Sequence, residues 1–210
     1  PLDISFDFIK GSSKKLLRFF PNLKILPTYC DYTKYIKLLK SISKTKIGFF
    51  LGSSIGNFYN NEEKKFIKNA KKTLGKNSFL FVGVDLIKNL KILKKAYNDK
   101  ENFNEKFNLN LINIINKEIK TKLKVKDFEY ISTFNKKKNS MENFIVSKKN
   151  QIFFIGNKKF TIKKNEKIQT EISNKFTVSK FSKLARASGW QVKKHWKDAK
   201  RYYAVFLLQS

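Results

Sequence analysis

The chain has 210 residues, of which 41% are hydrophobic and 15% aromatic, enough apolar material for a buried core in one domain or in one domain with an added lobe. This composition excludes a disordered tail. The formal charge of +30 raises nucleic acid and anionic membranes as partners. Only three of the 46 basic residues are arginines, whereas phosphate and base recognition usually recruits arginine as well as lysine. We therefore do not expect a nucleic-acid partner, and a basic RNA-binding or RNA methyltransferase module stays an alternative.

Cys30 and His195 are the only residues of their types. The chain can therefore form no internal disulfide and no Cys/His zinc site. Its longest apolar stretches, residues 79–84 and 202–208, are far shorter than the roughly 20 residues of a membrane helix. These features predict a soluble protein of the reducing cytoplasm, with no metal and no membrane partner.

The first segments predict two short strands, at residues 1–5 and 24–29, separated by a helix around residues 13–20. Asp3 lies in the first strand and Asp31 follows the second. Both aspartates become candidates for ligand binding, because ligands of open α/β sheets bind at the carboxyl ends of strands.

The next segments alternate between strand and helix patterns. Residues 46–51 predict a buried strand that runs into a glycine-bearing turn at 52–57. Residues 60–63 supply capping and acidic first-turn residues for a helix that ends at Gly75. Residues 78–86 are again almost continuously apolar. Strand, helix, strand in this order is typical of a βαβ unit in a sheet covered on both faces, and it predicts an α/β fold.

Residues 89–176 differ in character from the segments on either side. They begin with an asparagine-rich helical stretch over 90–119 and continue with alternating strand patterns at 141–147, 152–155 and 158–162. We interpret 89–176 as an inserted α+β lobe, and 1–88 with 177–210 as one α/β domain. In that domain the last elements are a predicted helix over 179–188 and a closing hairpin of strands 190–196 and 202–209.

Polar residues at strand ends are the first site candidates. Asn57 and Asp85 join the two aspartates there. Glu171 and Ser173 are two residues apart on an extended segment, so they point to one face and place a carboxylate beside a hydroxyl. A ring with two N–H groups would suit this pair, although an exposed strand face is the simpler interpretation of the pair alone.

Other catalytic patterns are missing from the sequence. His195 lies beside Trp196 in a predicted strand without a motif partner, so we assign it no catalytic role. The chain has no nucleophile elbow, no Walker loop and no carboxylate pair of the glycosidase type.

Five motifs follow one another along the chain: FFLGSSIGN (49–57), GVDLIKN (83–89), AYND (96–99), KFNLNLINIINKEI (106–119) and QTEISNKF (169–176). In this order they resemble one enzyme family, the histidine-specific Nα-methyltransferases of ergothioneine synthesis. The resemblance extends from PLDIS at the start of the chain to the strand at 202–208. It implies a class I methyltransferase with a Rossmann-like domain, which uses S-adenosylmethionine and closes an inserted lobe over a free amino acid.

The resemblance also implies roles for individual residues. Asp3 would hold the ribose of S-adenosylmethionine, and Asp31 with Tyr32 would flank its adenine. On the substrate side Asn57 and Tyr97 would hold the α-carboxylate of L-histidine, and Glu171 and Ser173 would recognise its imidazole. No proton acceptor is assigned. The product would be trimethylhistidine, hercynine.

The sequence departs from the family pattern in two places. The family's first strand and glycine-rich cofactor loop would lie before Pro1, so we interpret the chain as an amino-terminally truncated member, and an incomplete gene product or a pseudoenzyme stays open. The methionine that lines the family's substrate pocket is matched by Asn143, unless the register slips to Met141. Nα-methylation of another amino acid is therefore an alternative.

Overall fold

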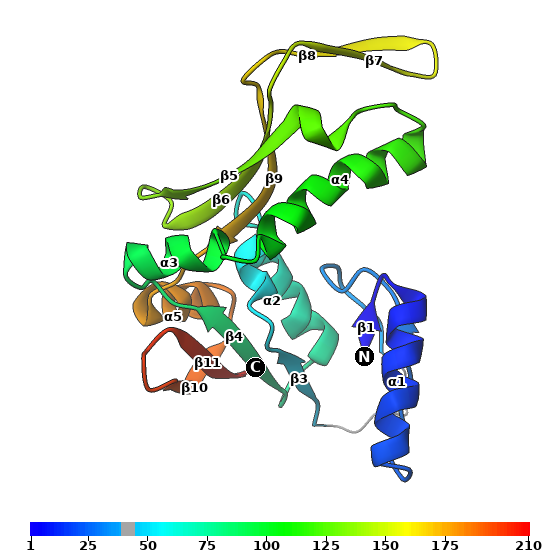
Figure 1. The fold of residues 1–210 in the computed structure, drawn as a ribbon. Helices are drawn as coiled ribbons and strands as arrows, with labels where there is room; N and C mark the ends of the chain where they lie inside the picture. The colour runs from blue at the N-terminus through cyan, green and yellow to red at the C-terminus, as the bar shows by residue number, and fades with distance from the viewer. Residues whose placement is uncertain (39–44) are drawn as a thin grey trace.

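The computed structural model describes residues 1–38 and 45–210, and its central sheet has four strands in the order β10-β11-β4-β3 (Figure 1). These strands are β3 (Ile47–Phe50), β4 (Phe79–Asp85), β10 (Gln191–Lys197) and β11 (Tyr203–Gln209). Strands β3 and β4 run parallel and are joined by helix α2 (Glu62–Leu74), which confirms the predicted strand, helix, strand unit. Strands β10 and β11 form the predicted closing hairpin.

Helix α2 ends as predicted but begins differently. Gly75 follows its last turn with a φ of 82°, a conformation that glycine adopts without strain. At the start, Asn61 makes no side-chain cap. Instead the Glu62 carboxylate accepts the backbone N–H of Tyr59 at 3.1 Å, so an acidic first-turn residue supplies the contact that the asparagines were expected to make.

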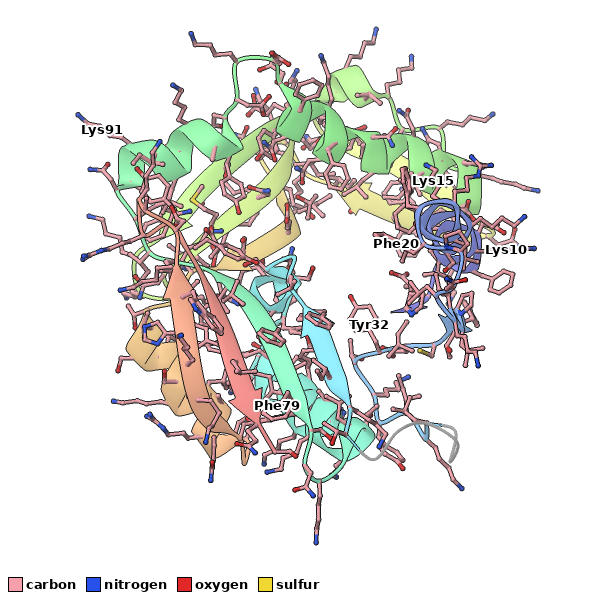
Figure 2. The ribbon with its side chains drawn as sticks, turned by 90° about the horizontal axis from the view of Figure 1, so that it is seen from below. Lys10, Lys15, Phe20, Tyr32, Phe79 and Lys91 are labelled. Atoms are coloured by element: carbon pink, nitrogen blue, oxygen red, sulfur yellow. The ribbon has the colours of Figure 1, made fainter. Side chains whose placement is uncertain are left out.

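The main core is built by every second side chain of strands β4 and β11. These side chains face α2 and helix α5 (Val178–Ala187) and are buried. They are Leu80, Val82 and Val84 of β4 and Ala204, Phe206 and Leu208 of β11. In Figure 2 both helices lie behind the four strands.

The opposite face of the sheet is more open than the apolar runs predicted. Among the residues that the structure describes, Phe49 is 68% exposed and Trp196 is 42% exposed on this side. They form an aromatic row with Phe81, whose ring stacks on Phe49 with centroids 5.2 Å apart. The prediction of a sheet covered on both faces was therefore wrong for the described part of the chain.

The amino-terminal elements form a separate unit beside this sheet, at the right of Figure 1. Strands β1 (Leu2–Asp3) and β2 (Thr28–Tyr29) pair in parallel, and each is shorter than predicted. Helix α1 (Phe6–Phe19) begins earlier than the predicted 13–20. Gly11 is a weak helix former, but the helix tolerates it in its interior.

Residues 89–176, which we call the lobe, contain two helices, a three-stranded sheet and a hairpin. Its elements are α3 (Leu90–Tyr97), α4 (Phe103–Ile119), β5 (Phe128–Asn135), β6 (Ser140–Ser147), β7 (Gln151–Ile155), β8 (Lys158–Ile162) and β9 (Lys167–Asn174). The sheet is antiparallel in the order β5-β6-β9, and β7 pairs with β8. A second hydrophobic cluster lies here, formed by Ile112, Leu123, Phe128, Ile145 and Ile162.

Two expectations for the lobe were wrong. The stretch 90–119 is two helices, because the Asp99 carboxylate accepts the backbone N–H groups of Phe103 and Asn104 at 2.7 and 3.0 Å and starts a new helix there. Strand β5 was not predicted, since its pattern of half-buried side chains lacks clear alternation.

The lobe meets the sheet at the carboxyl ends of β3 and β4. A short 3-10 helix, η1 (Ser54–Asn57), follows β3 and packs on β9, where the Asn174 amide donates to the Phe58 carbonyl at 3.0 Å. A second, η2 (Val125–Asp127), precedes β5. No helix of the described residues is long and apolar enough to cross a membrane.

Candidate active site

A polar cluster occupies the junction of sheet and lobe. Asn57 comes from η1, Asp85 ends β4, and Tyr97 ends α3. Glu171 and Ser173 come from β9. The four residues predicted for substrate binding are thus brought to one region by three elements, η1, α3 and β9.

The Glu171 carboxylate is held by two amides. Its Oε1 accepts from Asn57 Nδ2 at 3.0 Å, and its Oε2 accepts from Asn143 Nδ2 at 2.9 Å. The Tyr130 hydroxyl lies 3.1 Å from Asn143 Oδ1, which orients the amide with its nitrogen toward Glu171. No Lys or Arg of the described residues pairs with Glu171. A half-buried carboxylate with only neutral partners retains lone pairs for an N–H donor of a ligand.

The structure places Asn143 opposite Glu171 and Met141 opposite Ser173 in the β6–β9 ladder. Both side chains are buried. The residue beside the carboxylate is therefore an amide, and Met141 lies two cross-strand pairs away.

Lys175 is the site residue that the sequence did not reveal. Its side chain is 2% exposed, and its ammonium group pairs with Asp85 Oδ2 at 2.8 Å. It also donates to Ser173 Oγ at 2.6 Å and to the Tyr97 hydroxyl at 2.9 Å. The only sequence feature that could have indicated Lys175 is its position two residues after Ser173. In a chain this rich in lysine, that feature does not distinguish it from the others.

Phenol groups line the same region. Burial raises the pKa of Tyr130, and the charge of Glu171 adds to this shift. Burial likewise raises the pKa of Tyr59, with the charges of Glu171 and Glu142 adding to it. Both phenols therefore stay protonated at neutral pH, and the Tyr130 hydroxyl donates to Asn143 Oδ1.

The residues predicted for the cofactor lie at the other end of η1. Asp3 and Tyr32 line a cleft of about 590 Å³ between β1 and β3, together with Gly52 and Ser54. Asp3 Oδ1 accepts the Ser5 N–H at 2.8 Å, and its other oxygen accepts no hydrogen bond from the described residues.

Asp31 is less available than predicted. Its Oδ1 accepts from both the hydroxyl and the backbone N–H of Thr33, and its Oδ2 pairs with Lys34 at 3.2 Å. These contacts, the Thr33 hydroxyl first, lower the pKa of the Asp31 carboxyl. Asp31 is not among the residues that line the cleft of Asp3 and Tyr32.

His195 lies apart from both regions. It is exposed on β10, and its ring stacks on Phe206 with centroids 5.4 Å apart.

Comparisons with known proteins identify the family and the fold of the chain. The whole chain, residues 1–210, matches the family described as "Histidine-specific methyltransferase, SAM-dependent". The chain belongs to this family. A solved S-adenosylmethionine-dependent methyltransferase from Clostridium acetobutylicum shares the fold, with a TM-score of 0.51 over 99% of this chain and 73% of that chain at 10% identity. The Rossmann-like class I methyltransferase fold is thereby confirmed.

Curated relatives of this histidine-specific family match at modest identity. The histidine N-alpha-methyltransferase of Mycobacterium tuberculosis is 22% identical over 94% of this chain. Ergothioneine biosynthesis protein 1 of Neurospora crassa is 37% identical over 41% of this chain and 10% of its own length. The chain spans 62% of the length of the mycobacterial relative.

Proposed function

We propose that this chain forms the substrate-binding part of an enzyme that methylates the α-amine of L-histidine with S-adenosylmethionine, giving trimethylhistidine for ergothioneine synthesis. Family membership supports the reaction, and the names of the mycobacterial and Neurospora relatives support the substrate and the pathway. The observation that carries the proposal is the pairing of Glu171 and Ser173 on one face of β9.

This pair suits an imidazole ring. Glu171 offers a carboxylate with neutral partners, and Ser173 offers a hydroxyl two residues away. A ring nitrogen facing each of them would satisfy both polar groups. A ring without nitrogen atoms would leave them unpaired, and the cost of that selects against it.

The other end of the amino acid would be held by Asn57 and Tyr97. The Asn57 amide uses one N–H on Glu171, and its second N–H can donate to an α-carboxylate. The Tyr97 hydroxyl accepts from Lys175, so its own hydrogen is available to the same carboxylate. The amine between the carboxylate and the ring is then fixed in position, which is the main demand of a methyl transfer.

The cleft between β1 and β3 fits the cofactor. Asp3 has a carboxylate oxygen available to ribose hydroxyls, and Tyr32 supplies an aromatic face. When bound, S-adenosylmethionine supplies a methyl group already activated by its sulfonium. We infer that Asp3 and Tyr32 are its principal contacts in this chain and that Asp31 contributes less, because Thr33 and Lys34 occupy its oxygens.

We also infer that a further parallel strand from outside residues 1–210 completes the sheet between β1 and β3. Among the described strands β3 pairs only with β4, and the cleft beside it is lined by apolar side chains that include Ile47 and Phe49. The division into a domain of 1–88 with 177–210 and a lobe of 89–176 is part of this proposal. Two separate hydrophobic clusters support it. In the longest reading frame that contains this chain, the β3 amides should be as protected from hydrogen exchange as those of β4, and fast exchange of β3 would contradict the added strand.

The proposed function is tested with the protein encoded by that same reading frame. The purified protein is incubated with S-adenosylmethionine and a panel of free amino acids, and mass spectrometry resolves the products. Trimethylated histidine as the main product is expected. A different amino acid methylated in preference to histidine would overturn the substrate assignment, and methylation of none of them would overturn the proposal.

A further inference from the structure

Lys175 connects the two halves of the substrate site. An ammonium group has three N–H donors, and the structure gives each of them one acceptor: Asp85 on β4, Ser173 on β9 and Tyr97 on α3. Asp85 is also paired with Lys88 through its other oxygen, at 2.5 Å. The position of the Lys175 ammonium group is therefore fixed by its three partners.

This arrangement determines the direction of two hydroxyl hydrogens. The Ser173 and Tyr97 oxygens each accept a hydrogen bond from Lys175, so neither hydroxyl can donate to it. Within residues 1–38 and 45–210 neither hydroxyl donates to another group. Ser173 is only 9% exposed, and its hydrogen is therefore left for a ligand.

We propose that Lys175 is a positioning residue, which turns the Ser173 hydroxyl into a hydrogen-bond donor and makes the site select the neutral imidazole of the substrate. This inference rests on the proposed function. Glu171 accepts only, so it requires an N–H of the ring. Ser173, held as a donor, requires a bare ring nitrogen. One tautomer of neutral imidazole presents this combination, and imidazolium, with two N–H groups, does not.

The charges around the proposed ring position are consistent with a neutral imidazole. Two lysines, Lys175 and Lys88, share the single carboxylate of Asp85. The negative charge of Glu171 therefore balances the second of these two positive charges. The other titratable groups near this pair are the phenols of Tyr97, which Lys175 contacts, and of Tyr59 and Tyr130, whose pKa values are raised by burial and further by the charge of Glu171. Glu142 is opposite Ile172 in the ladder, on the other face of the sheet, and is paired with Lys138.

The first test uses the unmodified enzyme, as the longest reading frame that contains this chain. Imidazole takes up a proton near pH 6.5, so the KM for histidine should rise about tenfold for each pH unit below about 6. The control substrate is 1,2,4-triazolylalanine, whose weakly basic ring stays neutral over this range. Its KM should be constant. A histidine KM that does not change between pH 5 and 7, with histidine still methylated, would overturn the inference and leave the proposed function intact.

The second test separates positioning from general structural support. Lys175→Met frees the Ser173 hydroxyl to accept from imidazolium, so the rise in KM at low pH should shrink to about threefold or less. In a Ser173→Ala background the same substitution should have no further effect on the pH profile, because Lys175 acts through that hydroxyl. An unchanged low-pH rise in folded Lys175→Met would contradict the proposal.

If Lys175→Met does not fold, Ser173→Ala alone tests the inference, because this variant keeps the ion pair between Lys175 and Asp85. Its KM should depend much less on pH than that of the unmodified enzyme. Full retention of the low-pH rise in this variant would overturn the inference. Absence of any methylated histidine with the unmodified enzyme would overturn both this inference and the proposed function.

Discussion

The Glu171 carboxylate has only neutral hydrogen-bond partners among the described residues. A lysine or arginine paired with Glu171 would neutralise its charge and compete with a ligand for its oxygens. Two amides instead orient the oxygens and leave the negative charge available to a ligand. Asn143 contributes to this arrangement in place of the methionine expected from the family pattern. Its amide holds Glu171 and is itself oriented by Tyr130, so this departure from the family pattern strengthens the acceptor rather than removing it.

Glu171→Ala should raise the dissociation constant for histidine by about tenfold to a hundredfold, because a hydrogen bond to a charged group is lost and two amides lose their acceptor. Binding of S-adenosylmethionine should stay nearly the same, since Asp3 and Tyr32 lie in a separate cleft. Isothermal calorimetry with each ligand measures both. An equal loss of affinity for the two ligands would show that Glu171 supports the fold and not the substrate.

Among the elements, the contact between η1 and β9 decides where Asn57 and Glu171 meet. Gly56 makes this contact possible, because a Cβ atom at this position would lie 2.8 Å from the Asn174 carbonyl oxygen. Such a separation is too short for any real contact, so the two backbones would have to move apart. The glycine is thus needed for close packing of the two elements and not for a turn.

Gly56→Ala should lower the free energy of unfolding by about 1–3 kcal/mol through this overpacking. It should also weaken histidine binding, because Asn57 is shifted away from Glu171. Gly11→Ala in α1 is the matched control: nothing lies within 4 Å of its Cβ position, so it should stabilise the protein by about 0.5–1 kcal/mol. Thermal unfolding and calorimetry report the two effects, and similar behaviour of both variants would refute the packing argument.

The start of α4 depends on pH through Asp99. Backbone hydrogen bonds from Asn104 and Phe103 lower the pKa of its carboxyl from its ordinary value to about 2. A carboxyl with a lowered pKa in the folded state stabilises it above about pH 4 and loses that contribution as the pH falls toward 2. The protection factors of the Phe103 and Asn104 amides, which correct for the intrinsic pH dependence of exchange, should therefore fall between pH 4 and 2. In Asp99→Asn this fall should vanish, and its persistence would assign it to another group.

At the scale of the whole molecule, the positive charge is spread over the surface. Figure 2 shows lysine side chains extending outward around the rim, with Lys10 on α1 and Lys91 on α3 on opposite sides. The charges near the proposed substrate are largely paired with each other, as Lys175 and Lys88 are with Asp85. The net charge thus has little to do with the binding of a small amino acid.

The KM for histidine should change less than about threefold between 50 and 200 mM salt, because a zwitterion releases few counterions. A partner bound through its phosphates would lose about 10³- to 10⁵-fold in affinity over the same range. Steady-state kinetics at several salt concentrations, with fluorescence titration of a mixed-sequence RNA beside them, distinguish these cases. RNA binding at 50 mM salt that falls by this factor at 200 mM would favour the RNA methyltransferase alternative.

Local periodicity and strand alternation were enough to predict the βαβ unit, the closing hairpin and the common face of Glu171 and Ser173. They were not enough to predict strand β5 or the break at Asp99, since neither depends on a strong apolar pattern. The role of Lys175 became visible only in the folded chain. Its partners come from three elements far apart in the chain, and burial beside them is what makes this lysine different from the many that extend into solvent.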